Sequence, residues 1–167
     1  LAREVWSRDK VIEGDGPYLE RVKIYNNVIE GVTGVGIVLQ RIKLDLGKLG
    51  RYQDIKVTNN TIVRTKNAVV VADHPKFHNI VVRNNLAKTG GASYRFYSPL
   101  TASHNISSDR SATKASPLFV DYAGKDYRLK DGSPGVDHGT EIDAPRYDFD
   151  LVERALGSAF DIGAFER

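Results

Sequence analysis

Short runs in which apolar and polar residues alternate recur along the middle of the chain. Three of these runs, Val22–Ile29, Ile55–Ile62 and Ile80–Ala87, align with one another without gaps. Each consists of an alternating segment, a pair of asparagines and a second short apolar segment, which predicts a strand, a sharp corner and another strand. A weaker fourth copy covers Ala102–Ile106. The chain therefore carries an internal repeat, which is typical of stacked coils.

A third strand is expected in each repeat, because another apolar segment follows each of the three corners. These segments are Gly36–Leu39, Val69–Ala72 and Tyr94–Tyr97. The second asparagine of the corner recurs after 33, 25 and 20 residues, and a glycine-containing loop over 41–52 accounts for the longest interval. We therefore predict an all-β, right-handed parallel β-helix of about three to four coils over residues 1–115, and a C-terminal closing or capping segment of the same domain over residues 116–167.

The asparagine pairs are predicted to be structural corners. Asparagine tolerates left-handed backbone angles, and its amide both donates and accepts hydrogen bonds. Asn27, Asn60 and Asn85 can therefore stack along the helix axis as an asparagine ladder. The alternative is ordinary hairpin turns in a β-sandwich, but hairpins prefer Asn-Gly and do not require a repeat of three strands.

Alternation assigns a face to each side chain of the third strand. Arg95 is expected to face solvent, and aligning the repeats on their asparagines puts Ile37 and Val70 in the same column. Two sets follow from this alignment. Val38, Val71 and Phe96 are predicted to point inward, and Leu39, Ala72 and Tyr97 outward. In the first strand, Ile24, Val57 and Val82 are predicted to stack inward.

Composition narrows the class of protein. The 167 residues are 41% hydrophobic, which suffices for a folded core, and no apolar run is long enough to cross a bilayer. The absence of cysteine excludes disulfides and thiolate chemistry. A net charge of +3 without a dense basic tract favours anionic partners but not nucleic acid. The chain opens at Leu1 and lacks methionine, so we expect a processed chain or an excised piece whose active site could lie in missing N-terminal coils.

The end of the chain carries several short motifs. They are SPLFVD from Ser116, DYRLK from Asp126, GSPGVDHGT from Gly132 and DIGAFE from Asp161. This sequence resembles the C-terminal ending of bacterial secreted right-handed β-helix proteins with a pectate-lyase-like fold, over about residues 19–167. It departs from their pattern between Pro145 and Ala159, where Leu151–Leu156 looks helical. The apolar residues of this ending are expected to cover the open end of the β-helix, and Asp121, Asp137 and Asp161 to be turn residues.

The resemblance implies a secreted or cell-surface protein that acts on polysaccharide, with the signal peptide outside this chain. In such proteins the substrate groove follows the sheet just before the long loops. In this chain the residues there are Lys76, Arg95 and His74 as candidate catalytic groups, and Arg41, Lys43, Asp73 and Tyr97 as candidate substrate-binding groups. The same side chains are also what solvated loops ordinarily carry, and that alternative stays open.

The chemistry of these residues favours a lyase over a hydrolase. A lyase acting on a uronic acid needs a cation for the carboxylate and a base for the C5 proton, roles that Arg95 can share with Lys76 or His74. A hydrolase needs two carboxylates, and this region offers Asp73 and the loop residue Asp45. The acidic cluster Asp143, Asp148 and Asp150 leaves Ca²⁺ open as a cofactor, and no other metal site is predicted.

Three functions remain after the sequence is read. The first is a polysaccharide lyase, of which this chain is the C-terminal portion. The second is a non-catalytic carbohydrate-binding or cell-surface module. The third is a structural piece that pairs with a missing N-terminal part or with itself, because an open β-helix end exposes unpaired strands.

Overall fold

The computed structural model describes residues 18–40, 51–108 and 118–167. Twelve of its strands form three parallel sheets. Sheet A contains β1 (Tyr18–Glu20) and β2 (Lys23–Tyr25), which pair with β5 (Arg51–Thr58), followed by β8 (Phe77–Arg83) and β11 (Thr101–Ser103). Sheet B contains β3 (Val28–Glu30), β6 (Thr61–Val63), β9 (Leu86–Lys88) and β12 (Ile106–Ser108). Sheet C contains β4 (Val35–Leu39), β7 (Asn67–Val71) and β10 (Tyr94–Phe96).

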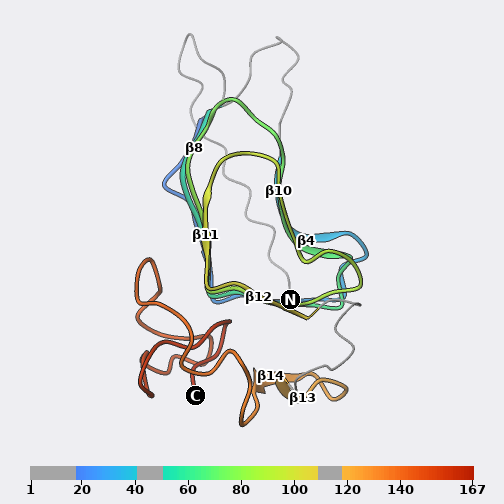
Figure 1. The fold of residues 1–167 in the computed structure, drawn as a ribbon, viewed down its shortest axis with the longest axis vertical. Helices are drawn as coiled ribbons and strands as arrows, with labels where there is room; N and C mark the ends of the chain where they lie inside the picture. The colour runs from blue at the N-terminus through green and yellow to red at the C-terminus, as the bar shows by residue number, and fades with distance from the viewer. Residues whose placement is uncertain (1–17, 41–50, 109–117) are drawn as a thin grey trace.

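The chain visits the sheets in the order A, B, C and then returns to sheet A one coil further on. Figure 1 looks along the axis of this stack, so that successive coils lie over one another. Every strand pair in the three sheets is parallel, which hairpins cannot produce. The prediction of an all-β parallel β-helix is confirmed. Among the described residues there is no helix long and apolar enough to span a membrane.

The corner between sheets A and B is held by a continuous asparagine ladder. The side-chain Nδ2 of Asn27 donates to Oδ1 of Asn60, that of Asn60 to Oδ1 of Asn85, and that of Asn85 to Oδ1 of Asn105, each over 2.9 Å. Asn60 and Asn85 are completely buried. Their Nδ2 atoms also donate to backbone carbonyls of their own coil and of the preceding one. Each amide is thus fully used, as a buried polar group must be.

The first residue of each corner turns the backbone. Asn26, Asn59 and Asn84 have φ of 53°, 51° and 54°, in the left-handed region that asparagine adopts more readily than other side chains. His104 does the same in the last coil, with φ of 52°. Because these residues point away from the interior, their side chains are free to bind the segment that packs outside the coils.

The burial of the side chains confirms most of the predicted inward and outward directions, but those of β4 in the first coil are reversed. Val57 and Val82 are buried and Val71 is fully buried, as expected. In the first coil, however, Leu39 is 8% exposed and faces inward, whereas Val38 is 43% exposed and faces outward. Val38, not Ile37, is in register with Val70 and Arg95. The prediction was wrong there by one residue.

The cause of this shift is the length of the turn between sheets B and C. Residues 31–34 form this turn in the first coil, and residues 64–66 form it in the second, so the first turn is longer by one residue. Gly31 adopts φ of 73° in the longer turn. A one-residue change of register exchanges the two faces of a strand. An alignment based on the asparagines alone does not detect the insertion.

The closing segment begins with an antiparallel hairpin, β13 (Phe119–Asp121) and β14 (Asp126–Leu129). It packs on the outer face of sheet B, not over an end of the stack. Its apolar cluster joins Leu118, Phe119, Tyr127, Leu129 and Ile162 with Val63 and Leu86, which point outward from sheet B. Figure 1 shows the hairpin beside β12, outside the outline of the coils. The expected cover exists, but it lies along the side of the β-helix.

Two details of the closing segment differ from the expectation. Leu151–Leu156 is not helical, and Leu151 is 80% exposed at φ of 65°. Val120, one of the residues expected to cover the core, is exposed. In contrast, the DIGAFE motif packs closely: a Cβ at Gly163 would lie 2.8 Å from Oγ1 of Thr61, and φ there is 108°. Only glycine fits this approach to the coils.

A buried ion pair fixes the closing segment to the first coil. The side chains of Arg154 and Glu166 are completely buried, 2.7 Å apart. The same guanidinium donates to Oδ1 of Asn26 and to the backbone carbonyls of Gly163 and Ala164. Burial lowers the pKa of Arg154 and raises that of Glu166. The pair therefore pays a desolvation penalty that its hydrogen bonds must offset.

Asp161 lies next to this pair and makes the stability depend on pH. Burial raises the pKa of Asp161 from 3.8 to about 6, and its Oδ2 has no partner among the described residues. Because the folded state holds this proton more tightly than the unfolded state, stability falls as the pH rises from about 4 to about 6.

We expect Asp161→Asn to remove the cost of ionising this buried carboxyl group. The free energy of unfolding should therefore exceed that of the wild type by about 1–3 kcal/mol at pH 7.5 and by much less at pH 4. Urea titrations of both proteins at the two pH values measure the difference. A difference that does not change with pH would refute this role.

Candidate functional site

The outward side of sheet C brings two of the predicted site residues together. Tyr94 and Phe96 pack against the core, so Arg95 in β10 and Tyr97 directly after it point to solvent. Tyr97 is 57% exposed, and its backbone N–H donates to Val71, which continues the sheet past β10. Two residues along a strand separate side chains by about 7 Å. The Arg95 guanidinium and the Tyr97 ring are thus both exposed on the outward side of sheet C.

Apolar side chains complete this surface on the neighbouring coils. Val70 is in register with Arg95, and Val38 with Val70. Val38 is exposed and Val70 and Ala72 are partly exposed. We call the surface formed by Val38, Val70, Ala72, Arg95 and Tyr97 the sheet C face. Val38 was missed in the sequence, because the longer turn before β4 hides its register.

The turn after β7 lies against the end of this face. Oγ of Ser98 accepts from the backbone N–H of His74 over 2.9 Å and donates to the carbonyl of Ala72 over 2.8 Å. The turn that carries Asp73 and Lys76 is therefore adjacent to the end of β10. Asp73 is exposed and Lys76 is partly exposed. The structure thus places Asp73 beside the end of the sheet C face, whereas Lys76 lies directly before β8, where its carbonyl accepts from the backbone N–H of Tyr52 in sheet A.

His74 is not on the surface. It is 3% exposed, its ring stacks on Phe77 at 4.8 Å and meets Tyr52 edge-on at 5.3 Å. Its Nδ1 accepts from the backbone N–H of Lys76 over 3.0 Å, which stabilises the turn. This position gives His74 a structural role and keeps it away from any ligand on the sheet C face. Sequence spacing could not distinguish this inward direction from an outward one.

Among the described residues, neither His78 nor the corner asparagines join the sheet C face. Arg41 and Lys43 lie outside the described residues, as does Asp45. His78 is exposed on sheet A, in register with Gln53, and so faces another side of the coil. Asn27, Asn60 and Asn85 form the interior corner and do not reach the sheet C face.

The acidic residues considered for calcium have other partners. Asp143 pairs with Lys56 and, over 2.9 Å, with Arg83. Asp148 is buried and accepts from the backbone N–H groups of Asp150, Val152 and Glu166. Within residues 18–40, 51–108 and 118–167, no three acidic or histidine side chains gather as a metal site would require.

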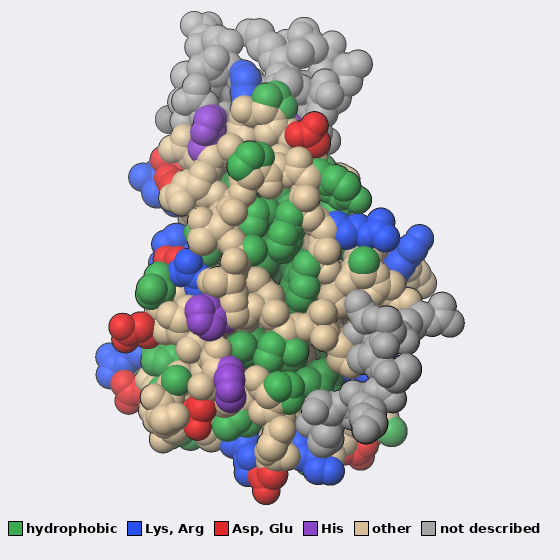
Figure 2. Space-filling model, in the orientation of Figure 1, with side chains coloured by type: hydrophobic (Ala, Val, Ile, Leu, Met, Phe, Trp, Pro, Cys, Tyr) green, Lys and Arg blue, Asp and Glu red, His purple; other side chains and the backbone are tan. Residues whose placement is uncertain are grey.

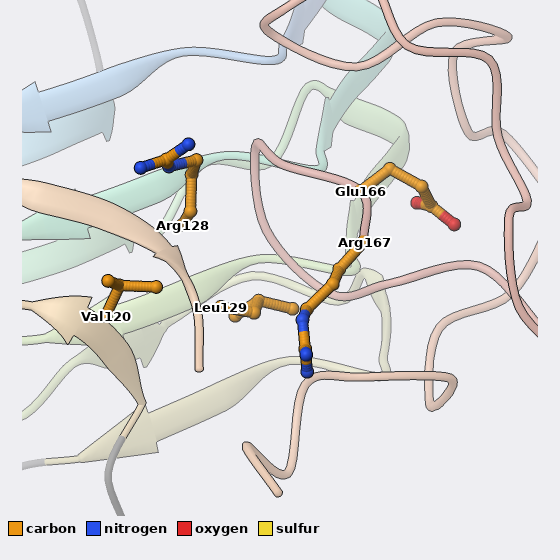
Figure 3. A pocket seen from close by; sticks show the side chains of 5 residues that line it. All are labelled: Val120, Arg128, Leu129, Glu166 and Arg167. Carbon is orange, nitrogen blue, oxygen red and sulfur yellow. The ribbon is translucent and has the colours of Figure 1, made fainter. Parts of the chain in front are cut away.

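A shallow hollow of about 360 Å³ lies between the hairpin and the C-terminus. Val120, Arg128, Leu129, Glu166 and Arg167 line it (Figure 3). Its arginines already pair with carboxylates, Arg128 with Asp126 and Arg167 with Asp131, and Glu166 pairs with Arg154. In Figure 3 the Glu166 carboxylate points away from Arg128. The hollow therefore presents little unpaired charge, and the sheet C face is the better candidate.

Comparison with known families gives one match. A family model described as "disaggregatase related" matches residues 12–143, which include strands β1 to β12 and the start of the closing segment. No curated protein and no solved structure matches the chain.

Proposed function

The chain belongs to the disaggregatase-related family, a polysaccharide-related family of β-helix type, and from that premise we propose that it binds an acidic polysaccharide along the sheet C face. The single observation that carries the proposal is that Arg95 in β10 and Tyr97 directly after it are both exposed on the sheet C face. A guanidinium binds a uronate carboxylate with two parallel hydrogen bonds. An exposed tyrosine offers a ring for the C–H side of a sugar and a hydroxyl for hydrogen bonds.

The reaction that this surface favours is β-elimination. Arg95 would neutralise the uronate carboxylate, which makes the C5 proton more acidic. Lys76, in the turn from β7 to β8, would take that proton as the base, and the C5 electrons would form the C4–C5 double bond. The glycosidic oxygen would leave from C4 and take a proton from water. Of the carboxylates that hydrolysis needs, the described part of this surface supplies Asp73 alone. Hydrolysis is therefore the weaker proposal.

A non-catalytic binding module is the second candidate. The burial of His74 favours this candidate, because its imidazole is the side chain best suited to accept a proton near neutral pH and it does not face the sheet C face. A polysaccharide ligand also agrees with a secreted or cell-surface location, which remains a prediction. The expected pairing with a missing N-terminal part or with a second copy remains a prediction as well.

A titration with acidic oligosaccharides tests the proposal. We expect Arg95→Gln combined with Tyr97→Ser to weaken binding by about 100-fold, because two contacts are lost at about 1.4 kcal/mol each. Arg128→Gln is the matched control, since Arg128 is an exposed arginine on the hairpin. Equal affinity of the double variant and the control would refute the proposal.

Ultraviolet absorbance of the same samples tests for β-elimination, because an unsaturated uronate absorbs there. A rise in absorbance that is lost in Lys76→Gln would support the lyase. Binding without such a rise would select the non-catalytic module.

A further inference from the structure

A second exposed cation and tyrosine lie close together on sheet A, on the side of the coil opposite the sheet C face. Lys23 and Tyr25 in β2 point outward on either side of Ile24, which packs against the core. Lys23 is exposed and Tyr25 is 46% exposed. Their spacing along the strand repeats that of Arg95 and Tyr97, so they also lie about 7 Å apart.

The charges around Lys23 are not balanced. Lys23 is in register with Lys56 on the adjacent strand, and like charges directly opposite one another are destabilising. Lys56 shares the carboxylate of Asp143 with Arg83, so one acidic group serves two cations. Among the described residues Lys23 has no carboxylate within ion-pair distance. An anion bound at Lys23 would relieve this repulsion.

The closing segment adds a second tyrosine to this surface. Nδ2 of Asn26 donates to the backbone carbonyl of Tyr147, which places that residue beside the corner that follows Tyr25. The buried Arg154 binds Oδ1 of the same asparagine over 3.1 Å, so the attachment is rigid. Tyr147 is 44% exposed, and the guanidinium of Arg146, which pairs with Glu153, lies 5.2 Å from the centre of its ring. Lys23, Tyr25 and Tyr147 form what we call the β2 patch.

We propose that the β2 patch is a second binding site for an acidic glycan. The class of ligand rests on the proposed function, whereas the site itself rests on the geometry of β2 and the closing segment. Sheets A and C lie on opposite sides of the coil (Figure 1). A short oligosaccharide bound at one site therefore leaves the other site open. The chain then holds two glycan segments at once and cross-links long chains, with the gain in avidity that two linked sites give.

Calorimetric titration with a short acidic oligosaccharide tests this inference, together with light scattering on the long polymer. We expect two ligands to bind the wild type, and one to bind Lys23→Gln/Tyr25→Ser or Arg95→Gln/Tyr97→Ser. We expect both double variants to bind the polymer but not to cross-link it. Asp121→Asn, on the exposed hairpin, is the control and should bind two ligands.

The outcomes separate the two proposals. If the wild type binds one ligand and only the Arg95/Tyr97 variant loses it, the second site is refuted and the proposed function is supported. One ligand lost only in the Lys23/Tyr25 variant overturns the proposed function at the sheet C face and supports the β2 patch. Absence of binding overturns both. Far-ultraviolet circular dichroism of each variant shows that the fold is retained.

Discussion

Replacing Asn60 by alanine is expected to lower the free energy of unfolding by about 3–5 kcal/mol, since each buried polar group left unpaired costs about 1–3 kcal/mol. The Asn60 side chain is completely buried in the middle of the ladder. Its Oδ1 accepts from both the backbone and the side chain of Asn27. Its Nδ2 donates to Asn85 and to two carbonyls. Alanine removes all of these bonds while the partners stay buried.

Asn27→Ala is the matched comparison, because Asn27 occupies the first described position of the same ladder. Asn27 is exposed, and its Nδ2 donates to Oδ1 of Asn60 and to the carbonyl of Tyr25. We expect a loss of about 1 kcal/mol, the ordinary net value of a hydrogen bond that water can replace. Urea denaturation of both variants supplies the two values. Similar losses for Asn27 and Asn60 would show that position within the ladder does not determine its contribution.

Arg154→Met is expected to cost about 3–5 kcal/mol, because it leaves the buried carboxylate of Glu166 without its counter-charge. The variant also removes the bond that ties the closing segment to Asn26. Glu166→Gln in the same chain should recover much of the loss, since no uncompensated charge then remains. The control is Arg146→Met, which breaks the exposed pair with Glu153 and should cost less than about 1 kcal/mol. Thermal and urea unfolding measure all three variants.

A loss in Arg154→Met that the second substitution does not recover would contradict the assignment of the penalty to Glu166. Hydrogen exchange then identifies the part of the chain that loosens. We expect the loosening to be confined to residues 118–167, because, among the described residues, the hydrogen bonds of Arg154 reach the coils at Asn26 and otherwise stay within the closing segment.

The sequence predicts the repeat correctly because its signals are local. An alternating strand followed by two asparagines reports on a corner that each coil forms by itself, and stacking then brings Asn27, Asn60 and Asn85 together. The faces of the second and third coils follow from alternation for the same reason. In the first coil one extra residue before Val35 exchanges the faces of Val38 and Leu39, and no local pattern marks it.

The position of the closing segment could not be read from its motifs. Leu118, Phe119 and Ile162 are apolar whether they cover an end of the coils or a side. What determines the side is the second apolar face of sheet B, where Val63 and Leu86 point outward. In the sequence these two residues belong to short apolar runs that are equally consistent with a strand buried on one face.

The candidate site was predicted in part. Arg95 and Tyr97 share a face because they are two residues apart in a strand, which period alone establishes. His74 follows the strand in a turn, where no period fixes its direction, and the ring packs on Phe77 in the core. The β2 patch could not be predicted, because Tyr25 and Tyr147 are far apart in the sequence and the bond from Asn26 to Tyr147 places both at the same corner.

The most direct test of the central claim is a map of amide chemical shifts during titration with an acidic oligosaccharide. If the sheet C face binds the glycan, the shifts of Arg95 and Tyr97 and of the neighbouring Val70 and Ala72 will change together with increasing ligand, and those of the hairpin around Arg128 will not. Saturation of the protein with ligand while Arg95 and Tyr97 keep their shifts would contradict the claim.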